Sequence, residues 1–328
     1  MTGDGVRHPV PTFTGDVDGT ELGMTLIHEH VFVGDPELDL SLPHPEWDED
    51  AAIERAVAGF TRLHELGVDT VVDLTVPGLG RNVERVRRVA ERVPVRLVAS
   101  TGYYTSDVLP HFFHLNGPGL LVDGPDPLVA LFIDDISRGI AGTSIRAGMI
   151  KVASDAGGIT PDVEHVFTAA SIAHLETGVP ITTHSHAPSR GGIEQQRMLS
   201  QLGVPLDRVV IGHSGDSTDI DYLRELADNG SFLGFDRFGM AHTGTDSDRI
   251  RMLLSMLELG YEHQLVLSHD AAFFSRITPP SWRAEHAPNW QMEHLSRHVL
   301  PELRRSGVDD DTRRLLTVEN PRRALTGR

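Results

Sequence analysis

Short runs of apolar and β-branched residues alternate with amphipathic stretches along most of this chain. Within the amphipathic stretches the apolar positions recur at steps of three and four residues, which covers one face of a helix. This alternation is typical of repeated βα units built on a parallel sheet. We expect eight strands, at Met24–His28, Asp69–Leu74, Val95–Ser100, Ala147–Val152, Pro180–His184, Val209–Gly212, Ser231–Phe235 and Gln264–Ser268. We expect helices between most of them, for example at Asp50–Leu66, Val83–Arg92, Pro161–Glu176 and Ile220–Asn229.

Eight strands separated by helices predict an α/β fold, a single (β/α)8 TIM barrel with its active site at the C-terminal ends of the strands. A length of 328 residues suits one such barrel, and we see no linker or internal repeat, so we predict one domain over residues 1–328. Three long segments rich in Gly, Pro and aromatic residues are expected as loops at the barrel mouth: Pro110–Asp126, Phe235–Arg249 and Ala271–Pro288.

Polar residues interrupt the apolar runs at the ends of several predicted strands. The six that matter most are His28, His30, Lys151, His184, His213 and Asp270. Because barrel active sites gather at the carboxyl ends of the strands, we expect these side chains to converge. Imidazole and carboxylate groups suit zinc and its first-row neighbours, and a lysine among them suggests two metals. Together the six residues predict a binuclear metallohydrolase.

The first two histidines, His28 and His30, are two residues apart, so on a strand both side chains face the same side and can bind one metal. Alone this pair is a weak signal, because buried histidines are more often simply hydrogen-bonded. The same spacing recurs in His184-Ser185-His186, where we expect only His184 to face the metals.

Lys151 lies inside an apolar strand, where an unpaired ammonium group would be costly to bury. A desolvated neutral amine can add carbon dioxide and become a carbamate, whose two oxygens can bridge two cations. The alternative is a lysine that forms an ion pair with a carboxylate inside the barrel. Lys151 therefore points to a metal bridge only in the company of the other five residues.

The composition narrows the possible partners. Lys and Arg number 29 against 47 Asp and Glu, and the resulting net charge of −18 argues against nucleic acid or an anionic membrane as a partner. With no cysteine, any metal ligands must be nitrogen or oxygen donors. The stretch Met1–Gly5 lacks the basic and apolar regions of a secretory signal, and no run is long enough to span a membrane. We therefore expect a cytoplasmic protein that acts on a small molecule.

Several motifs along almost the whole chain are similar to those of one known family. They are Thr25-Leu26-Ile27-His28-Glu29-His30, Val71-Val72-Asp73-Leu74-Thr75, Glu194-Gln195-Gln196-Arg197, Ile211-Gly212-His213-Ser214-Gly215-Asp216, Asp236-Arg237-Phe238-Gly239, Ser268-His269-Asp270 and Glu319-Asn320-Pro321. By these motifs the chain resembles the phosphotriesterase family of the amidohydrolase superfamily, most closely its phosphotriesterase-like lactonases. The resemblance is weakest in the first twenty residues and in the loops after the last two strands.

The resemblance implies a role for each candidate ligand. His28, His30 and Asp270 would hold a buried metal, and His184 and His213 a more exposed one. N6-carboxylated Lys151 and a hydroxide would bridge the two divalent ions. Zinc is expected, although cobalt, manganese or iron would suit the same ligands. Asp270 would also be catalytic, accepting a proton from the hydroxide and passing it to the leaving group.

The resemblance also implies a substrate class. Tyr104 matches the tyrosine that lactonases of this family place beside the metals, although the adjacent Tyr103 could take that place instead. Arg237 stands where dedicated phosphotriesterases carry histidine, and Asp216 is a candidate for orienting the ligands. We therefore expect a lactonase for N-acyl homoserine lactones or γ- and δ-lactones, with promiscuous phosphotriesterase activity and a possible role in quorum quenching.

Two alternatives stay open at this point. The chain could be a dedicated phosphotriesterase, that is, an aryldialkylphosphatase. It could also be a non-catalytic metal-binding homologue, but such a protein would be expected to lack a ligand, and all six are present. Relatives of this family are commonly homodimers, which implies a homodimer here, and the apolar residues around Phe112 and Phe113 could serve as its interface.

Overall fold

The structure, a computed structural model, describes residues 9–328. The stretch Met1–Gly5, from which a cytoplasmic location was predicted, lies outside the described residues. The strands are β1 (Pro9–Thr12), β2 (Gly15–Asp18), β3 (Thr25–Val33), β4 (Thr70–Asp73), β5 (Arg96–Gly102), β6 (Ala147–Ala153), β7 (Ile181–His184), β8 (Val209–Ile211), β9 (Phe232–Phe235), β10 (Leu265–Leu267) and β11 (Ala272–Ser275). The helices are α1 (Pro36–Ser41), α2 (Glu49–Glu65), α3 (Val83–Ala90), α4 (Phe112–Leu115), α5 (Pro127–Ser137), α6 (Pro161–Thr177), α7 (Gly191–Gln201), α8 (Ile220–Asp228), α9 (Asp246–Glu258), α10 (Pro280–His286), α11 (Leu300–Arg305), α12 (Asp310–Arg314) and α13 (Asn320–Thr326).

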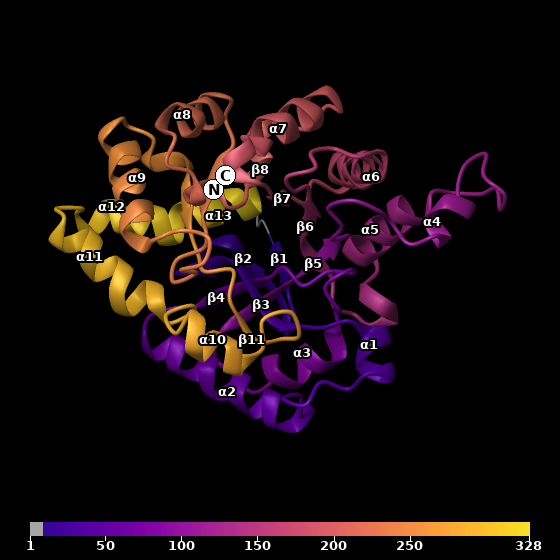
Figure 1. The fold of residues 1–328 in the computed structure, drawn as a ribbon, viewed down its shortest axis with the longest axis horizontal. Coiled ribbons are helices and arrows are strands. Elements are labelled where there is room, and N and C mark those ends of the chain that lie inside the picture. Colours follow the sequence, from indigo (N-terminus) through magenta and orange to yellow (C-terminus); the bar gives the residue numbers. More distant parts are fainter. Residues whose placement is uncertain (1–8) are drawn as a thin grey trace, which may run out of the picture.

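Strands β3 to β11 form one curled parallel sheet in the order β10-β9-β8-β7-β6-β5-β4-β3-β11. Figure 1 shows these strands at the centre of the molecule with the helices arranged around them. The predicted α/β barrel is confirmed, and each of the eight predicted strands is present, with ends displaced by a few residues. The sequence did not reveal the N-terminal β1–β2 hairpin or the short strand β11.

The barrel closes where the chain after β10 meets β3. The backbone N–H of Asp270 donates to the carbonyl of His28 at 3.0 Å, and the N–H of His30 donates to the carbonyl of Ala271 at 2.8 Å. The fully buried Glu29 carboxylate strengthens this seam by accepting hydrogen bonds from the side chains of Ser268 and His269. The seam therefore fixes the position of Asp270 relative to the two histidines of β3.

Two apolar clusters lie on the two sides of the barrel wall. One cluster contains a residue from each of several strands, including Ile27, Val72, Val98, Met149 and Val266, and packs in the interior. A larger cluster lies between the strands and the surrounding helices. A register shift in β3 between Leu26 and Glu29 allows Ile27 to join the interior cluster while His28 reaches the polar site above it.

The long helices begin where a polar side chain caps them. Asp48, Asn82, Thr160, Asp219 and Thr245 each accept a hydrogen bond from a backbone N–H in the first turn of the helix that follows. Such caps satisfy backbone donors that a helix otherwise leaves free. They set the starting points of helices that pack their apolar faces against the barrel. Among residues 9–328, no helix is long and apolar enough to cross a membrane.

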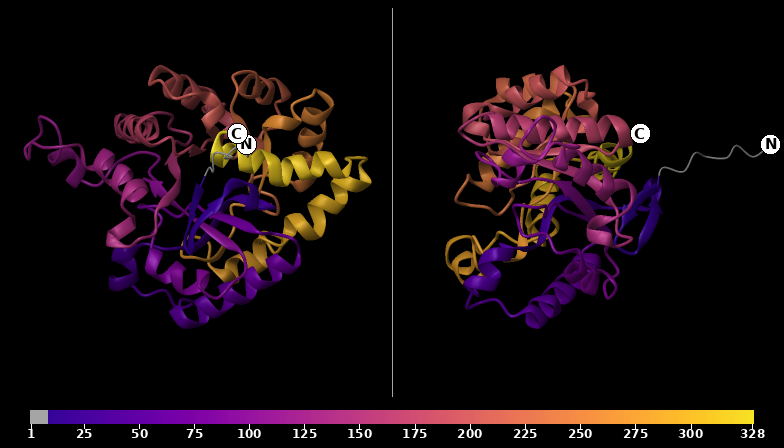
Figure 2. Two further views of the ribbon diagram at one scale, coloured as in Figure 1. Left: turned by 180° about the vertical axis from the view of Figure 1, so that it is seen from behind. Right: turned by 90° about the vertical axis from the view of Figure 1, so that its right-hand side faces the viewer.

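The right-hand view in Figure 2 separates the two ends of the barrel: the β1–β2 hairpin and the C-terminus lie at one end, and the orange and gold loops after β9 and β11 lie at the other. Two predicted mouth loops, Phe235–Arg249 and Ala271–Pro288, do supply pocket-lining residues. The prediction for Pro110–Asp126 was wrong. This segment contains α4, projects sideways in Figure 1, and contributes nothing to the pocket lining.

Candidate metal centre

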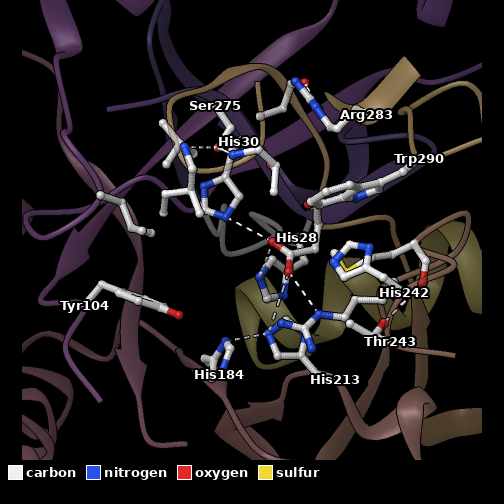
Figure 3. Close-up of a pocket in the computed structure, with 18 of the residues that line it drawn as sticks. His28, His30, Tyr104, His184, His213, His242, Thr243, Ser275, Arg283 and Trp290 are labelled. Carbon is white, nitrogen blue, oxygen red and sulfur yellow. Dashed lines mark hydrogen bonds and ion pairs between the residues drawn. The ribbon is translucent and has the colours of Figure 1, made fainter. Parts of the chain in front are cut away.

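All six predicted ligands line one pocket at the carboxyl ends of the strands. They come from β3, β6 and β7 and from the residues that follow β8 and β10. Figure 3 shows His28, His30, His184 and His213 converging in the middle of the pocket, with Tyr104 on one side and Trp290 on the other. Strands far apart in the sequence thus bring their polar end residues to one place, as the barrel topology requires.

Three of the residues gather around one carboxylate oxygen. Asp270 Oδ1 lies 3.2 Å from His30 Nε2 and 3.6 Å from His28 Nε2. On the other side of His28 Nε2, the amine of Lys151 lies 3.1 Å away. Two imidazoles and a carboxylate around a small space form a donor set that suits a divalent cation.

A second pair of ring nitrogens lies next to this group. His184 Nδ1 and His213 Nε2 face each other at 3.0 Å, and His213 Nε2 lies 3.8 Å from Asp270 Oδ2. The amine of the fully buried Lys151 contacts His28 Nε2 and the backbone carbonyl of Thr183. Within residues 9–328, no carboxylate lies within ion-pair distance of this amine. The ion-paired alternative for Lys151 is therefore not observed among the described residues.

Asp236, directly after β9, holds two of the imidazoles in place. Its carboxylate accepts from His28 Nδ1 at 2.8 Å and from both the ring Nδ1 and the backbone N–H of His213. These contacts leave Nε2 of both rings pointing into the pocket. Asp216, the carboxylate expected to orient the ligands, reaches them only through Arg237, which contacts Asp270. The carboxylate on the two histidines is Asp236, which sequence reasoning missed. The sequence signal that could have indicated Asp236 is its position directly after the predicted apolar strand Ser231–Phe235.

A similar contact chain orients His30. Its Nδ1 lies 2.9 Å from the hydroxyl of Thr75, which in turn donates to Asp73 Oδ1 at 2.6 Å. Burial raises the pKa of Asp73, although hydrogen bonds from Thr75 counteract the effect. Both residues lie in or just after β4, within the motif Val71–Thr75.

The protonation of these groups suits cation binding. Burial is the main cause that lowers the pKa of His28, His184 and His213, so their nitrogens are neutral and can offer lone pairs. Burial also lowers the pKa of Lys151 to about 8. For Asp270, burial would raise the pKa, but the surrounding histidines and Arg237 hold it well below its usual range. Neutral imidazoles of His28, His184 and His213 beside an ionised carboxylate suit divalent cations.

Two of the six residues have an unusual backbone. His213 and Asp270 have φ of +63° and +54°, values in the left-handed region that non-glycine residues rarely adopt. Each lies two or three residues after a barrel strand, and the turn directs its side chain into the pocket. Such local strain is concentrated at functional sites, where the surrounding contacts hold it in place.

Of the two adjacent tyrosines and the second histidine of the His184–His186 pair, only Tyr104 lines the pocket. Tyr104 lines the pocket with its ring centroid 5.6 Å from that of His184, and burial raises its pKa to about 12. Tyr103 instead packs against Phe113. His186 contacts Ser189 outside the pocket, as expected for the second histidine of that pair.

Arg237 lies in a chain of alternating charges. Its Nε contacts Asp270 at 3.1 Å and its Nη1 contacts Asp216 at 3.0 Å. The other oxygen of Asp216 accepts from the fully buried Arg249 on α9, which also donates to the carbonyl of Gly244. Arg249 thereby ties the loop after β9 to the site. Sequence reasoning missed Arg249 because an arginine in an amphipathic helix is normally solvated.

The chain is similar to known proteins over almost its whole length. A profile described as the Phosphotriesterase family matches residues 8–325. A "Phosphotriesterase homology protein" of Mycobacterium tuberculosis is 45% identical over 95% of this chain and 96% of its own length. An "Aryldialkylphosphatase" of Saccharolobus solfataricus is 38% identical over 94% of this chain and 96% of its own length. The solved structure of the phosphotriesterase from Mycobacterium tuberculosis superposes with a TM-score of 0.94 at 44% identity, covering 97% of this chain and 98% of that one.

Replacing Asp236 should weaken metal retention. In Asp236→Asn only one side-chain oxygen remains to accept from His28 and His213, and the new amide group opposes a ring donor. We expect the affinity for divalent metal to fall by about 10- to 100-fold, the usual effect of losing a group that orients a ligand. Competition with a chromophoric chelator measures this affinity.

The matched control is Asp216→Asn, because Asp216 contacts two arginines and neither histidine. It should retain metal much better than Asp236→Asn. Equal loss in both variants would contradict the orienting role of Asp236.

Proposed function

Because this chain belongs to the phosphotriesterase family, whose members are metal-dependent hydrolases, we propose that it is a lactonase with a weaker activity on phosphotriesters. The observation that carries this proposal is the position of Arg237, which lines the pocket while it holds Asp270. The proposed substrates are N-acyl homoserine lactones and γ- or δ-lactones, and quorum quenching is a role consistent with the former.

The six clustered residues would hold two divalent metals, most simply zinc. His28, His30 and Asp270 would bind one and His184 and His213 the other, with carboxylated Lys151 between them. When bound, such a pair supplies a water of lowered pKa and polarises the carbonyl oxygen under attack. The buried carboxylate of Asp236 accepts from His28 Nδ1 and His213 Nδ1 and so keeps Nε2 of both rings directed into the pocket.

Asp270 is the group placed to move protons. Its Oδ1 lies among the histidines, and Arg237 holds Oδ2 from the opposite side. In the proposed mechanism the carboxylate takes a proton from the attacking water and returns it to the oxygen that leaves as the lactone ring opens. The low pKa of Asp270 keeps this carboxylate ionised, and therefore able to accept the proton, across the neutral range.

Tyr104 and Arg237 flank this centre and favour a lactone over a triester. Tyr104 keeps its proton, because its pKa is about 12, so its hydroxyl can donate to a substrate oxygen. Arg237 and Met240 line the side of the pocket formed by the loop after β9. A dedicated aryldialkylphosphatase is the second candidate, supported by the relative that carries that name.

A substrate panel tests this proposal. It contains a short and a long N-acyl homoserine lactone, a δ-lactone and an aryl dialkyl phosphate, all assayed with one metal-replete preparation. We expect kcat/KM for the best lactone to exceed that for the phosphotriester by about tenfold or more. A higher value for the phosphotriester would reverse the assignment of substrate and leave the metal centre in place.

Two variants sharpen the panel. Arg237→His should shift the ratio of the two activities toward the phosphotriester, because it removes the arginine from the pocket. Asp270→Asn, with its metal content verified, should lose lactonase activity by about 10²-fold or more if Asp270 transfers the proton. Full activity in the metal-loaded Asp270→Asn variant would overturn the proton-transfer role.

The carbamate on Lys151 has its own test. A neutral Nζ attacks carbon dioxide, a new N–C bond forms, and the amine proton is released to solvent. Since only the neutral amine reacts, recovery of metal binding by the metal-free protein should require carbon dioxide. At a fixed concentration of dissolved carbon dioxide, it should accelerate as the pH rises from about 7 to about 9, through the pKa of about 8. Lys151→Met should bind metal about tenfold more weakly or worse at every pH. Recovery that is independent of both pH and carbon dioxide would contradict the carbamate.

A further inference from the structure

One buried arginine at the pocket has no role in the chemistry above. Arg283 on α10 lines the pocket near Ser275 and Trp290 and is only 8% exposed. Figure 3 shows Arg283 and Trp290 on the same side of the pocket, and the guanidinium carbon lies 5.5 Å from the centre of the Trp290 ring. Arg283 is therefore held against an aromatic face beside the candidate metal centre.

The guanidinium of Arg283 lacks a counter-charge. Within residues 9–328 no carboxylate lies within ion-pair distance of it, and its one hydrogen-bond acceptor is the backbone carbonyl of Ala272, which accepts from Nη1. Nε is buried without any partner in the same part of the chain. Nη2 makes no hydrogen bond within the described residues either, so two of the three guanidinium nitrogens have no acceptor there.

Its neighbour Arg237 provides the contrast. Both arginines line the same pocket, but two carboxylates, Asp216 and Asp270, neutralise Arg237. The chain carries 47 acidic residues against 29 basic ones, so a buried arginine without an acidic partner is not explained by any shortage of carboxylates. Burial lowers the pKa of Arg283 to about 10, which still leaves the group positively charged at neutral pH.

Burying an unpaired cation is costly unless a ligand completes its contacts. The π face of Trp290 offsets part of this cost. Trp290 is itself fixed relative to the reacting centre, because its Nε1 donates to the backbone carbonyls of His269 and Asp270. The guanidinium of Arg283 therefore has a defined position with respect to Asp270.

We propose that Arg283 binds a carboxylate group of the substrate, so that the preferred lactones carry an acidic group on the part of the molecule that lies away from the metals. This inference rests on the proposed function and specifies its substrate class. A carboxylate supplies both the missing negative charge and an oxygen that can accept from a guanidinium N–H. Ile277 and Met240, which also line the pocket, contact the apolar part of such a substrate.

The test compares two lactones that differ in one group: a γ-lactone whose side chain ends in a carboxylate, and the methyl ester of the same compound. The wild-type enzyme should have a kcat/KM for the acid about tenfold or more above that for the ester, the usual gain from a charge-assisted pair of hydrogen bonds. In Arg283→Met this ratio should fall to about one or below, and Arg283→Lys, which keeps the charge without the planar fork, should give an intermediate ratio.

The matched control is Arg276→Met. Arg276 lies in the neighbouring loop but is ion-paired with Asp39, 3.1 Å away, and does not line the pocket. It should retain the wild-type ratio, which excludes a general effect of positive charge near the mouth. The proposal is overturned if the wild-type enzyme does not prefer the acid, or if Arg283→Met keeps the preference.

A binding measurement separates this proposal from the lactonase assignment. If neither lactone is hydrolysed, the lactonase proposal fails, and Arg283 is tested by calorimetric titration of the metal-loaded protein with hexanoate and with hexanamide. Hexanoate should bind the wild-type protein about tenfold more tightly than Arg283→Met, and hexanamide should bind both alike. Equal affinity of hexanoate for the two proteins would refute the carboxylate site.

Discussion

The carboxylate of Asp236 is the contact on which the rest of the site depends. It is buried at the end of β9, and it accepts from the ring of His28 on β3 and from the ring and backbone of His213 after β8. Without it, two imidazoles on separate strands could each rotate, and Nε2 of each ring would no longer be directed at the centre. A single acceptor thus couples three strands of the barrel to the geometry of the metal centre.

Charge balance extends outward from this point. The ionised Asp270 is one end of a chain of ion pairs in which acidic and basic side chains alternate: Asp270–Arg237–Asp216–Arg249. Each buried charge in this chain therefore has an opposite charge beside it. Because Arg249 also bonds to the carbonyl of Gly244, the same chain fixes the loop after β9. Arg283 is the exception to this balance, and its free donors indicate where a ligand completes the set of charges.

The sequence predicted the barrel because it contains eight apolar runs with helical periodicity between most of them. It located the candidate ligands because polar residues such as His184 and Asp270 end apolar strands. Other features depend on tertiary contacts that periodicity cannot report. The pairing of Asp236 with His28 joins residues 208 positions apart, and the left-handed backbone of His213 follows from a turn. Loop direction is equally hidden, which is why Pro110–Asp126 was wrongly placed at the mouth. The isolation of Arg283 appears only when every neighbouring side chain is in position.

The central claim is that six side chains from five barrel strands or the residues that follow them form one binuclear metal site. The most direct measurement of this claim is the metal content of the purified protein, determined by elemental analysis against an accurate protein concentration. The account predicts about two divalent ions per chain, because His28, His30 and Asp270 form one cluster of ligand atoms and His184 and His213 face each other beside it. A protein that contains only trace metal after incubation with zinc and bicarbonate, or that saturates at about one ion per chain, would contradict it.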